Sequence, residues 1–224
     1  FAAILFTFQI YGDFSGYSDI AIGTAKLFGI KLMRNFNNPY FSRDIAEFWR
    51  RWHISLTTWF RDYVYIPLGG SRPEVPAHIK NPDRYKKWII VRNTFVIFLL
   101  SGFWHGANWT FIAWGAYHAL LFLPLILLGK NRKYTNQVGD GRLLPTWTET
   151  FQILCTFLLV VLGWIIFRAE TITQAWDIIK SIFSKSLFTI PWLRNRYFYI
   201  PLFTCLVLQI LTEWINRQKS HPFD

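Results

Sequence analysis

Several long apolar stretches dominate this sequence. Residues 151–167 are seventeen positions without a formal charge, and residues 197–215 are nineteen with Glu213 as their single charged side chain. A helix needs roughly 20 apolar residues to cross ~30 Å of hydrocarbon. A third stretch, 109–129, is bounded by Trp109 and Lys130, as interfacial anchors would be. With 52% hydrophobic and 17% charged residues, the chain is expected to be a membrane protein rather than a soluble domain.

Residues 88–129 are too long for one span. As a continuous helix they would measure about 63 Å at ~1.5 Å per residue, about twice the hydrocarbon thickness. The sequence GFWHGAN at 102–108 interrupts them with two glycines and an asparagine. Non-helical backbone at membrane depth is tolerated only where protein or a water-filled cavity satisfies its polar groups. A helix break at 102–108 therefore predicts a cavity beside it.

Residues 41–66 carry the clearest helical periodicity. At ~100° per residue, nine apolar side chains share an arc of roughly 120°; they are Ile45, Phe48, Trp49, Trp52, Leu56, Trp59, Phe60, Tyr63 and Ile66. The charged residues Arg43, Asp44, Glu47, Arg50, Arg51, Arg61 and Asp62 occupy the other side. We expect one helix, capped by Ser42 and lying along the membrane interface, with Arg50 and Arg61 wet and Trp52 and Trp59 buried.

The remaining segments complete an all-α expectation. Residues 171–188 are amphipathic and are read as a second interfacial or loop helix. The chain starts at Phe1 within an apolar run, without an initiator methionine, which predicts a C-terminal part of a larger integral protein. Residues 1–224 are expected to form one domain of a polytopic membrane protein, with transmembrane helices, a broken helix at the active site and interfacial amphipathic helices.

The net charge of +11 fits nucleic acid, an acidic substrate or anionic lipid. Most basic residues flank the apolar stretches, in groups such as Arg84, Lys86 and Lys87 or Lys130, Arg132 and Lys133. Juxtamembrane cations are held by anionic headgroups, so membrane lipids are the expected partner. No soluble basic domain carries a recognition motif, and no nucleic-acid partner is expected.

His105 is the strongest candidate for chemistry, because it lies at the predicted break with a glycine beside it. Flanking glycines allow a substrate close to the ring, and Trp104 and Trp109 can exclude water. An imidazole titrates near neutrality and can take a proton from a hydroxyl and return it to a leaving group. The alternative is a histidine that hydrogen-bonds the broken helix end. Trp104, Asn108 and Trp109 are expected to contact substrate.

The other histidines have weaker cases. His53 falls at the border of the two faces of 41–66, as a second catalytic group or as structural support. His118 lies inside an apolar stretch, where an ionisable group is a functional candidate, although a hydrogen-bonded packing histidine fits equally. His78 and His221 lie in polar segments and are expected to be solvated. No histidine, cysteine or carboxylate cluster has metal-ligand spacing, so no metal site is predicted.

Two further polar groups are possible sites. Asp13 and Asp19, in YGDFSGYSD, could line a polar passage or cap helices. The sequence GDFSG at 12–16 is not the G-x-S-x-G elbow of serine hydrolases. The sequence does not support a serine nucleophile.

Three stretches resemble the membrane-bound O-acyltransferase family, in its bacterial branch of alginate O-acetylation and teichoic acid D-alanylation proteins. They are YGDFSGYSDIAIG at 11–23, NFNNPYFSRDIAEFWRRWHISLTTWFRDYVYIPLGG at 35–70 and SGFWHGANW at 101–109. The resemblance covers the first half closely and the spans after Gly129 only in general character. The ending YIPLGG and the opening YGDFSGYSDIA look more like the alginate type.

The resemblance implies a role for each histidine and for the partners. His105, in the W-H-G motif, would be catalytic, and His53, in W-H-I-S, would be the second functionally important histidine. The protein would form a funnel in the bacterial inner membrane, with several spans. It would move acetyl from a cytoplasmic thioester, acyl-CoA or an acyl carrier protein, toward an exported polysaccharide. No cofactor would be bound, and an extracytoplasmic acetyltransferase could complete the transfer.

Two alternatives stay open at this point. Within the same class, the chain could transfer D-alanine to teichoic acid, or acylate another surface glycan or a protein. From another class, intramembrane histidines could serve a proton relay in a non-catalytic channel or transporter. Cleavage of a thioester separates the enzyme from the transporter.

Overall fold

The computed structural model describes residues 1–184 and 196–219, and this part of the chain is helical. The predicted span over 197–215 falls within a helix that the structure describes, whereas 185–188 and His221 lie outside the described residues. The elements are α1 (Ala2–Leu27), η1 (Pro39–Phe41), α2 (Ile45–Arg51), α3 (Ile54–Phe60), η2 (Arg61–Tyr65), α4 (Pro82–His105), α5 (Trp109–Leu127), α6 (Trp147–Arg168), α7 (Ile172–Ile182) and α8 (Arg196–Ile215).

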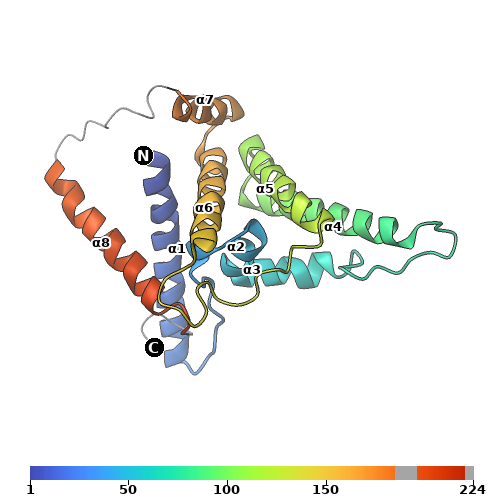
Figure 1. Cartoon of the computed structure of the whole chain (residues 1–224), viewed down its shortest axis with the longest axis horizontal. Helices are drawn as coiled ribbons and strands as arrows, with labels where there is room; N and C mark the ends of the chain where they lie inside the picture. Colours follow the sequence, from blue (N-terminus) through green and yellow to red (C-terminus); the bar gives the residue numbers. More distant parts are fainter. Residues whose placement is uncertain (185–195, 220–224) are drawn as a thin grey trace.

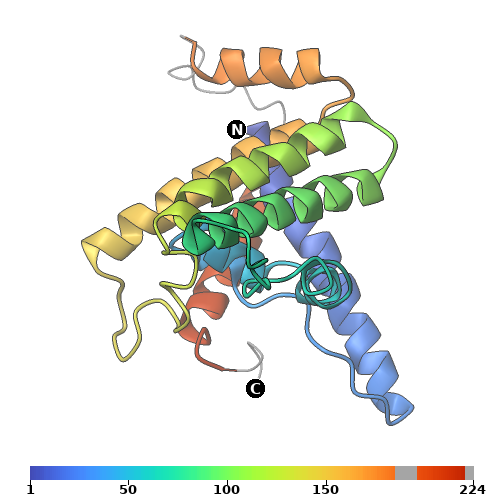
Figure 2. The ribbon, with the colours of Figure 1, turned by 90° about the vertical axis from the view of Figure 1, so that its right-hand side faces the viewer.

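Three of these helices, α4, α5 and α6, are long and apolar enough to cross a membrane. The helix α6 lies at the centre, packed against α5 on one side and α1 on the other (Figure 1). The short helix α7 turns away from the end of α6 and lies across it (Figures 1 and 2). The predicted amphipathic helix after residue 171 is therefore present, with Thr171 capping it.

The helices α4 and α5 form a tight hairpin whose backbones touch at two glycines. A Cβ atom at Gly102 would lie 2.3 Å from the carbonyl oxygen of Phe111, and one at Gly115 would lie 2.2 Å from that of Phe98. Between the helices, Gly106 adopts φ 148°, a conformation that side chains disfavour. The break predicted at 102–108 is confirmed, and Asn108 caps α5 by accepting from the backbone N–H of Thr110.

The single helix predicted over 41–66 is wrong, because the chain breaks between α2 and α3. Trp52 is extended and His53 is left-handed, with φ 45°. The segment before α2 supplies the hydrogen bonds that a continuous helix would have made. Asn37 N–H donates to the carbonyl of Arg51, and the carbonyl of Asn35 accepts from Ile54 N–H. Backbone groups earlier in the chain thus stabilise the break.

The start of α2 and the faces of this segment also differ from expectation. Asp44, not Ser42, caps α2, since its side chain accepts from the backbone N–H of Glu47; the Ser42 hydroxyl donates to the carbonyl of Pro39. Arg50, Arg61 and Trp52 have the predicted exposure, whereas Trp59 is 50% exposed. Hydrophobic periodicity alone therefore did not predict which side of α3 is buried.

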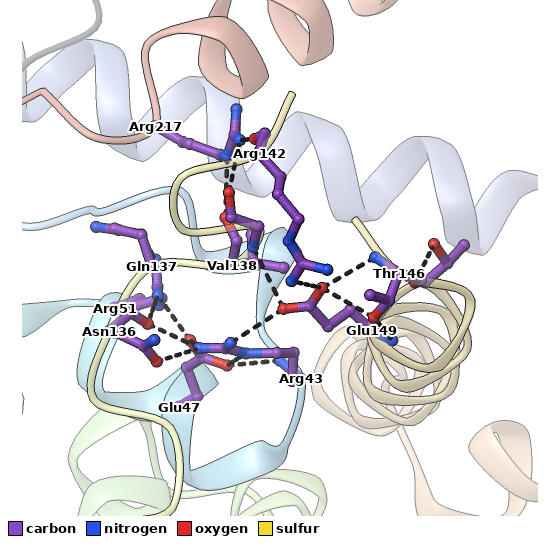
Figure 3. A network of polar contacts seen from close by, with 12 residues as sticks. Arg43, Glu47, Arg51, Asn136, Gln137, Val138, Arg142, Thr146, Glu149 and Arg217 are labelled. Carbon is purple, nitrogen blue, oxygen red and sulfur yellow. Dashed lines mark hydrogen bonds and ion pairs between the residues drawn. The ribbon is translucent and has the colours of Figure 1, made fainter. Parts of the chain in front are cut away.

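Except for Arg50, the charged residues of α2 are buried rather than wet. Glu47 is 1% exposed and forms ion pairs with Arg43 at 2.9 Å and Arg51 at 2.6 Å. Both arginines also donate to the loop between α5 and α6, at Asn136 and Gln137 (Figure 3). Buried charges persist when they are paired and hydrogen-bonded. This polar clamp, Arg43, Glu47 and Arg51, fixes α2 against the loop.

Other arginines hold the same loop from different directions. Arg50 donates to the carbonyls of Asn131 and Tyr134. Arg217, just after α8, is 4% exposed and donates to the carbonyls of Val138, Gly139 and Arg142 (Figure 3). The loop has no regular secondary structure, so arginine side chains provide the donors that a sheet or helix would otherwise provide.

Asp13 and Asp19 lie inside α1 and cap no helix. Phe1 is at the N-cap of α1, and both aspartates are exposed. Tyr11 and Ser18 are the residues of this motif that turn inward. The capping interpretation of the two aspartates is therefore wrong.

Candidate active site

A cavity of about 640 Å³ lies where α2, α3, α4, α5 and α6 meet. Its inner wall is aromatic and includes Trp49, Trp52, Trp114, Trp164 and Phe167. Both His53 and His105 line it. The cavity predicted beside the break in 88–129 is thus present, and it brings together two histidines that are 52 positions apart in the sequence.

His105 is the last residue of α4, and aromatic rings surround it. Its ring centroid lies 4.9 Å from those of Trp104 and Phe167 and 5.3 Å from that of Trp114. A Cβ atom at Gly106 would lie 2.8 Å from the ring of Phe111, so this position has no room for a side chain. The break therefore places the imidazole at a helix end, between α5 and α6.

His53 occupies the second break, between α2 and α3. Its ring meets Phe14 at 4.6 Å, and its Nδ1 lies 3.5 Å from the Ser55 hydroxyl. Burial, together with the nearby His105, lowers the pKa of His53 to about 4. The side chain is therefore neutral at physiological pH, with a lone pair available to accept a proton.

Trp104 joins the two histidines, with ring centroids 6.3 Å from His53 and 4.9 Å from His105. Trp104 is itself 58% exposed and is not among the residues that line the cavity. The other two predicted substrate contacts lie farther from the histidines. Asn108 caps α5 and donates to the carbonyl of Glu170, and Trp109 is 75% exposed. Neither residue lines the cavity among the described residues. Their substrate contact stays a prediction.

The remaining described histidines lie outside the cavity lining. His118 is buried, and its Nδ1 accepts a hydrogen bond from the indole of Trp49 at 3.3 Å, which supports the packing interpretation. His78 is exposed in the loop before α4. Among the described residues, no three histidine, cysteine, aspartate or glutamate side chains gather in a way that could hold a metal ion.

The outer part of the cavity is polar. Arg50, Arg61 and Arg132 line it together with Thr57, Thr58, Asn131, Thr135 and Ser71. The sequence interpretation missed this rim, and it missed Trp114, Trp164 and Phe167 of the inner wall. Helical spacing held part of the signal: Trp114 precedes His118 by four residues and Trp164 precedes Phe167 by three, so each pair shares a helix face.

The family model for the membrane-bound O-acyltransferase family matches residues 1–167. The chain is 45% identical over 182 residues to a probable alginate O-acetylase of Pseudomonas aeruginosa, covering 81% of this chain and 31% of that protein. It is 40% identical to a peptidoglycan O-acetyltransferase of Helicobacter pylori over 99% of this chain and 41% of that protein.

A teichoic acid D-alanyltransferase of Bacillus subtilis is 36% identical over 74% of this chain and 40% of its own length. The chain thus spans about a third of the alginate O-acetylases and about two fifths of the other two relatives. The matched region contains both helix breaks and all of α4, α5 and most of α6. By its sequence, this chain belongs to the membrane-bound O-acyltransferase family.

Proposed function

We propose that this chain forms the transfer site of a membrane-bound O-acyltransferase, with His105 as the general base. The observation that carries the proposal is the placement of His53 and His105 at two separate helix breaks facing one aromatic cavity. A break within apolar sequence, like the one at His105, is hard to satisfy and is tolerated where it lines a cavity. Two breaks that each present an imidazole to the same cavity fit a proton-transfer site.

The reaction needs a proton carrier and close positioning of two substrates. The imidazole of His105 removes the proton from the acceptor hydroxyl as its oxygen attacks the thioester carbonyl. The tetrahedral intermediate then collapses, the carbon–sulfur bond breaks, and the imidazolium returns the proton to the leaving thiolate. The products are an ester and a thiol. Because the thioester is already activated, positioning and one proton carrier account for most of the catalysis required.

His53 supports this step from the other break. Its neutral ring and the ring of His105 both contact Trp104, so it can orient an acceptor hydroxyl or hold the indole that contacts both rings. Both roles that the sequence left open for His53, second catalytic group and support, fit this position. His53→Gln distinguishes them, because the amide keeps a hydrogen-bonding group but cannot act as a base.

Acetyl is the group we propose to be moved, and a glycan hydroxyl its acceptor. Two of the relatives bear names of O-acetyl transfer, to alginate and to peptidoglycan. The peptidoglycan relative matches 99% of this chain and the alginate relative 81%, so both polymers are candidate acceptors. The proposal includes a thioester donor, acyl-CoA or an acyl carrier protein, an inner-membrane location and an extracytoplasmic acetyltransferase as partner.

The test is transfer from a labelled acetyl thioester by the full-length protein in proteoliposomes, with His105→Ala compared to His78→Ala. General base catalysis contributes about 10²–10⁴-fold, so His105→Ala should lose activity by that factor. His78 is exposed and outside the cavity lining, so its variant should keep full activity. Near wild-type transfer by folded His105→Ala protein would contradict the proposal, as would solute transport with the thioester left intact.

D-alanyl transfer is a second candidate, because the Bacillus subtilis relative bears that name. The same proteoliposomes can be given an acetyl thioester and a D-alanyl thioester in competition. Preference for the acetyl donor supports O-acetylation. Preference for the D-alanyl donor would replace the proposed acyl group and leave the role of His105 unchanged.

A further inference from the structure

We propose that His118 is a positioning residue that fixes the cavity walls Trp49 and Trp114 and, through them, the ring of His105. This inference rests on the proposed function of His105 as the proton carrier. His118 does not line the cavity. It lies directly behind it, where it touches residues of α2, α4, α5 and α6.

The first link is a hydrogen bond between two buried rings. The indole Nε1 of Trp49 donates to Nδ1 of His118 at 3.3 Å, and the side chains are 9% and 1% exposed. A buried donor without a partner is costly, so this bond selects one orientation of the indole. It is also a cross-link between α2 and α5.

The second link is Trp114, one helical turn before His118 on α5. Its ring centroid lies 5.1 Å from that of His118 and 5.3 Å from that of His105. It also lies 5.6 Å from Trp49. The three rings of His118, Trp49 and Trp114 therefore contact one another pairwise. Trp114 also contacts His105, so a shift of the three rings would move the imidazole of His105.

The third observation is the lack of room behind His118. A Cβ atom at Gly163 of α6 would lie 2.7 Å from its Nε2 atom, and Phe98 of α4 stacks beside it with centroids 6.2 Å apart. Gly163 is thus the position on α6 that admits the imidazole. A side chain enclosed on this many sides cannot turn away without moving a neighbouring helix.

These contacts predict an effect on rate that exceeds the effect on folding. A misplacement of about 1 Å in a catalytic group can lower the rate 10²-fold. His118→Leu fills most of the same space but offers no acceptor, so kcat should fall about 10- to 100-fold while KM stays within about threefold. His118→Asn places a carbonyl oxygen near the Nδ1 position, so it should retain most of kcat.

The first experiment measures kcat, KM and Tm for the full-length protein with His118→Leu, His118→Asn, Trp49→Phe and the double variant Trp49→Phe with His118→Leu. If the two residues act as a pair, the double variant should be about as slow as the slower single variant rather than the product of both effects. Multiplicative effects, or the same kcat for the Leu and Asn variants, would overturn the proposal.

Gly163 allows an independent test from α6. Gly163→Ala pushes against the imidazole and should lower kcat in the wild-type background. In the His118→Asn background the effect should be smaller, because the shorter side chain lacks the Nε2 atom and the contact that remains, with the ring of Tyr117, is longer at 3.3 Å. Gly12→Ala is the matched control, since it is also a helical glycine and has no atom within 4 Å of an added Cβ. Equal effects of the Gly163 and Gly12 variants would contradict the role of His118.

The chemical reactivity of His105 can be measured independently of acyl transfer, which separates this inference from the proposed function. Carbethoxylation of His105 by diethyl pyrocarbonate can be followed by peptide mass spectrometry, with exposed His78 as the internal standard. His118→Leu should change the His105 rate severalfold and leave the His78 rate unchanged. Should His105→Ala retain full transfer, the proposed function fails, and this reactivity still tests the packing link. An unchanged His105 rate and wild-type kcat in folded His118→Leu protein overturn the inference alone.

Discussion

The two sides of α2 differ in how their buried polar groups are satisfied. On the side of the polar clamp, Glu47 accepts from Arg43 and Arg51, and both arginines also bond to the loop before α6 (Figure 3). On the other side, Trp49 and Trp52 face the cavity, where His53 and His105 are surrounded mainly by rings. One short helix thus anchors the fold through ion pairs and forms a wall of the cavity through aromatic residues.

This difference indicates that the clamp side of α2 contributes mainly to stability and the cavity side mainly to reactivity. The charges of the clamp are buried and paired with one another, so removing one member leaves a buried charge with fewer partners. The rings around the histidines offer little competition for their nitrogen atoms, which favours proton transfer; the Ser55 hydroxyl lies 3.5 Å from Nδ1 of His53. Substitutions on the clamp should therefore reduce folded protein, whereas substitutions on the cavity side should reduce rate.

The largest effect is expected for Glu47→Gln. It removes the carboxylate that Arg43 and Arg51 share. Arg43 keeps Glu149 at 3.4 Å, whereas Arg51 keeps the neutral acceptors Asn37, Asn136 and Gln137, and breaking a buried pair typically costs about 3–5 kcal/mol. Thermal unfolding in detergent would measure the loss. The control is Asp62→Asn, which breaks the exposed pair of Arg61 and Asp62 and should change Tm little. Equal Tm values for both variants would show that the buried ion pairs of the clamp stabilise the fold no more than an exposed pair does.

Gly102→Ala should have the next largest effect, on the cavity side. Its Cβ would lie 2.3 Å from the carbonyl oxygen of Phe111, so α4 and α5 must separate. Overpacking of this kind costs about 1–3 kcal/mol, and the end of α4 that carries His105 should shift with it. We expect both lower Tm and lower kcat, measured against Gly16→Ala. Full activity in Gly102→Ala would mean that the hairpin does not set the position of His105.

Asn35→Ala tests the break that presents His53. The Asn35 side chain accepts from the backbone N–H of Ser55 at 3.1 Å, and a typical hydrogen bond contributes about 0.5–1.5 kcal/mol. We expect a small loss of stability with a larger loss of kcat, because the turn that orients His53 loosens. Asn35→Asp keeps the acceptor and should retain more activity. If the Ala variant loses stability but keeps its kcat, Asn35 contributes to folding, as the clamp does, and not to the orientation of His53.

His53 should also add a pH dependence to stability. Its pKa is about 4 in the folded chain because of burial, against an ordinary value of ~6.5. Between these values the unfolded chain binds a proton that the folded chain excludes. Stability is therefore fully present above pH ~6.5 and falls as the pH drops toward 4. Unfolding curves for His53→Gln should fall less steeply across this window than those of wild-type protein; parallel curves would contradict the shift.

The smallest effect is expected for Trp109→Ala. Trp109 is 75% exposed, and surface substitutions usually change stability by less than about 0.5 kcal/mol. Trp104→Ala is the matched comparison, because that indole contacts both histidines and its loss should lower kcat/KM clearly. A larger loss with Trp109→Ala would support the predicted substrate contact of Trp109 and would extend the site beyond the cavity.

The sequence allowed one of the two breaks to be predicted, and the reason is physical. At 102–108 the signal is local: the segment exceeds the bilayer thickness and contains glycines where it must turn. At Trp52–His53 the apolar periodicity continues, and the groups that satisfy the break, Asn35 and Asn37, lie earlier in the chain. A pattern within 41–66 cannot report hydrogen bonds made outside it.

The same limit explains why the burial of the clamp and the meeting of the two histidines could not be predicted from local sequence. Periodicity places Glu47 on the polar side of 41–66, and charged side chains are mostly exposed, so the sequence gives no sign that Glu47 is buried. The loop that covers its partner Arg43 lies far along the chain, since Arg43 and Asn136 are 93 residues apart. His105 and His53 were found because each lies in a short motif. Their convergence on one cavity depends on helix packing, which no local motif specifies.

Because the clamp and the loop that it binds are far apart in the sequence, the clamp is synthesised well before the loop. Chains are synthesised at about 5–20 residues per second, so the 93 residues from Arg43 to Asn136 take roughly 5 to 20 s to follow. During that interval two arginines share one carboxylate and lack their loop acceptors, which favours keeping this side of α2 at an aqueous surface. Trp164, part of the cavity wall, emerges later still. A nascent chain stalled before residue 136 should therefore leave Arg51 open to an arginine reagent, and one stalled after α6 should protect it.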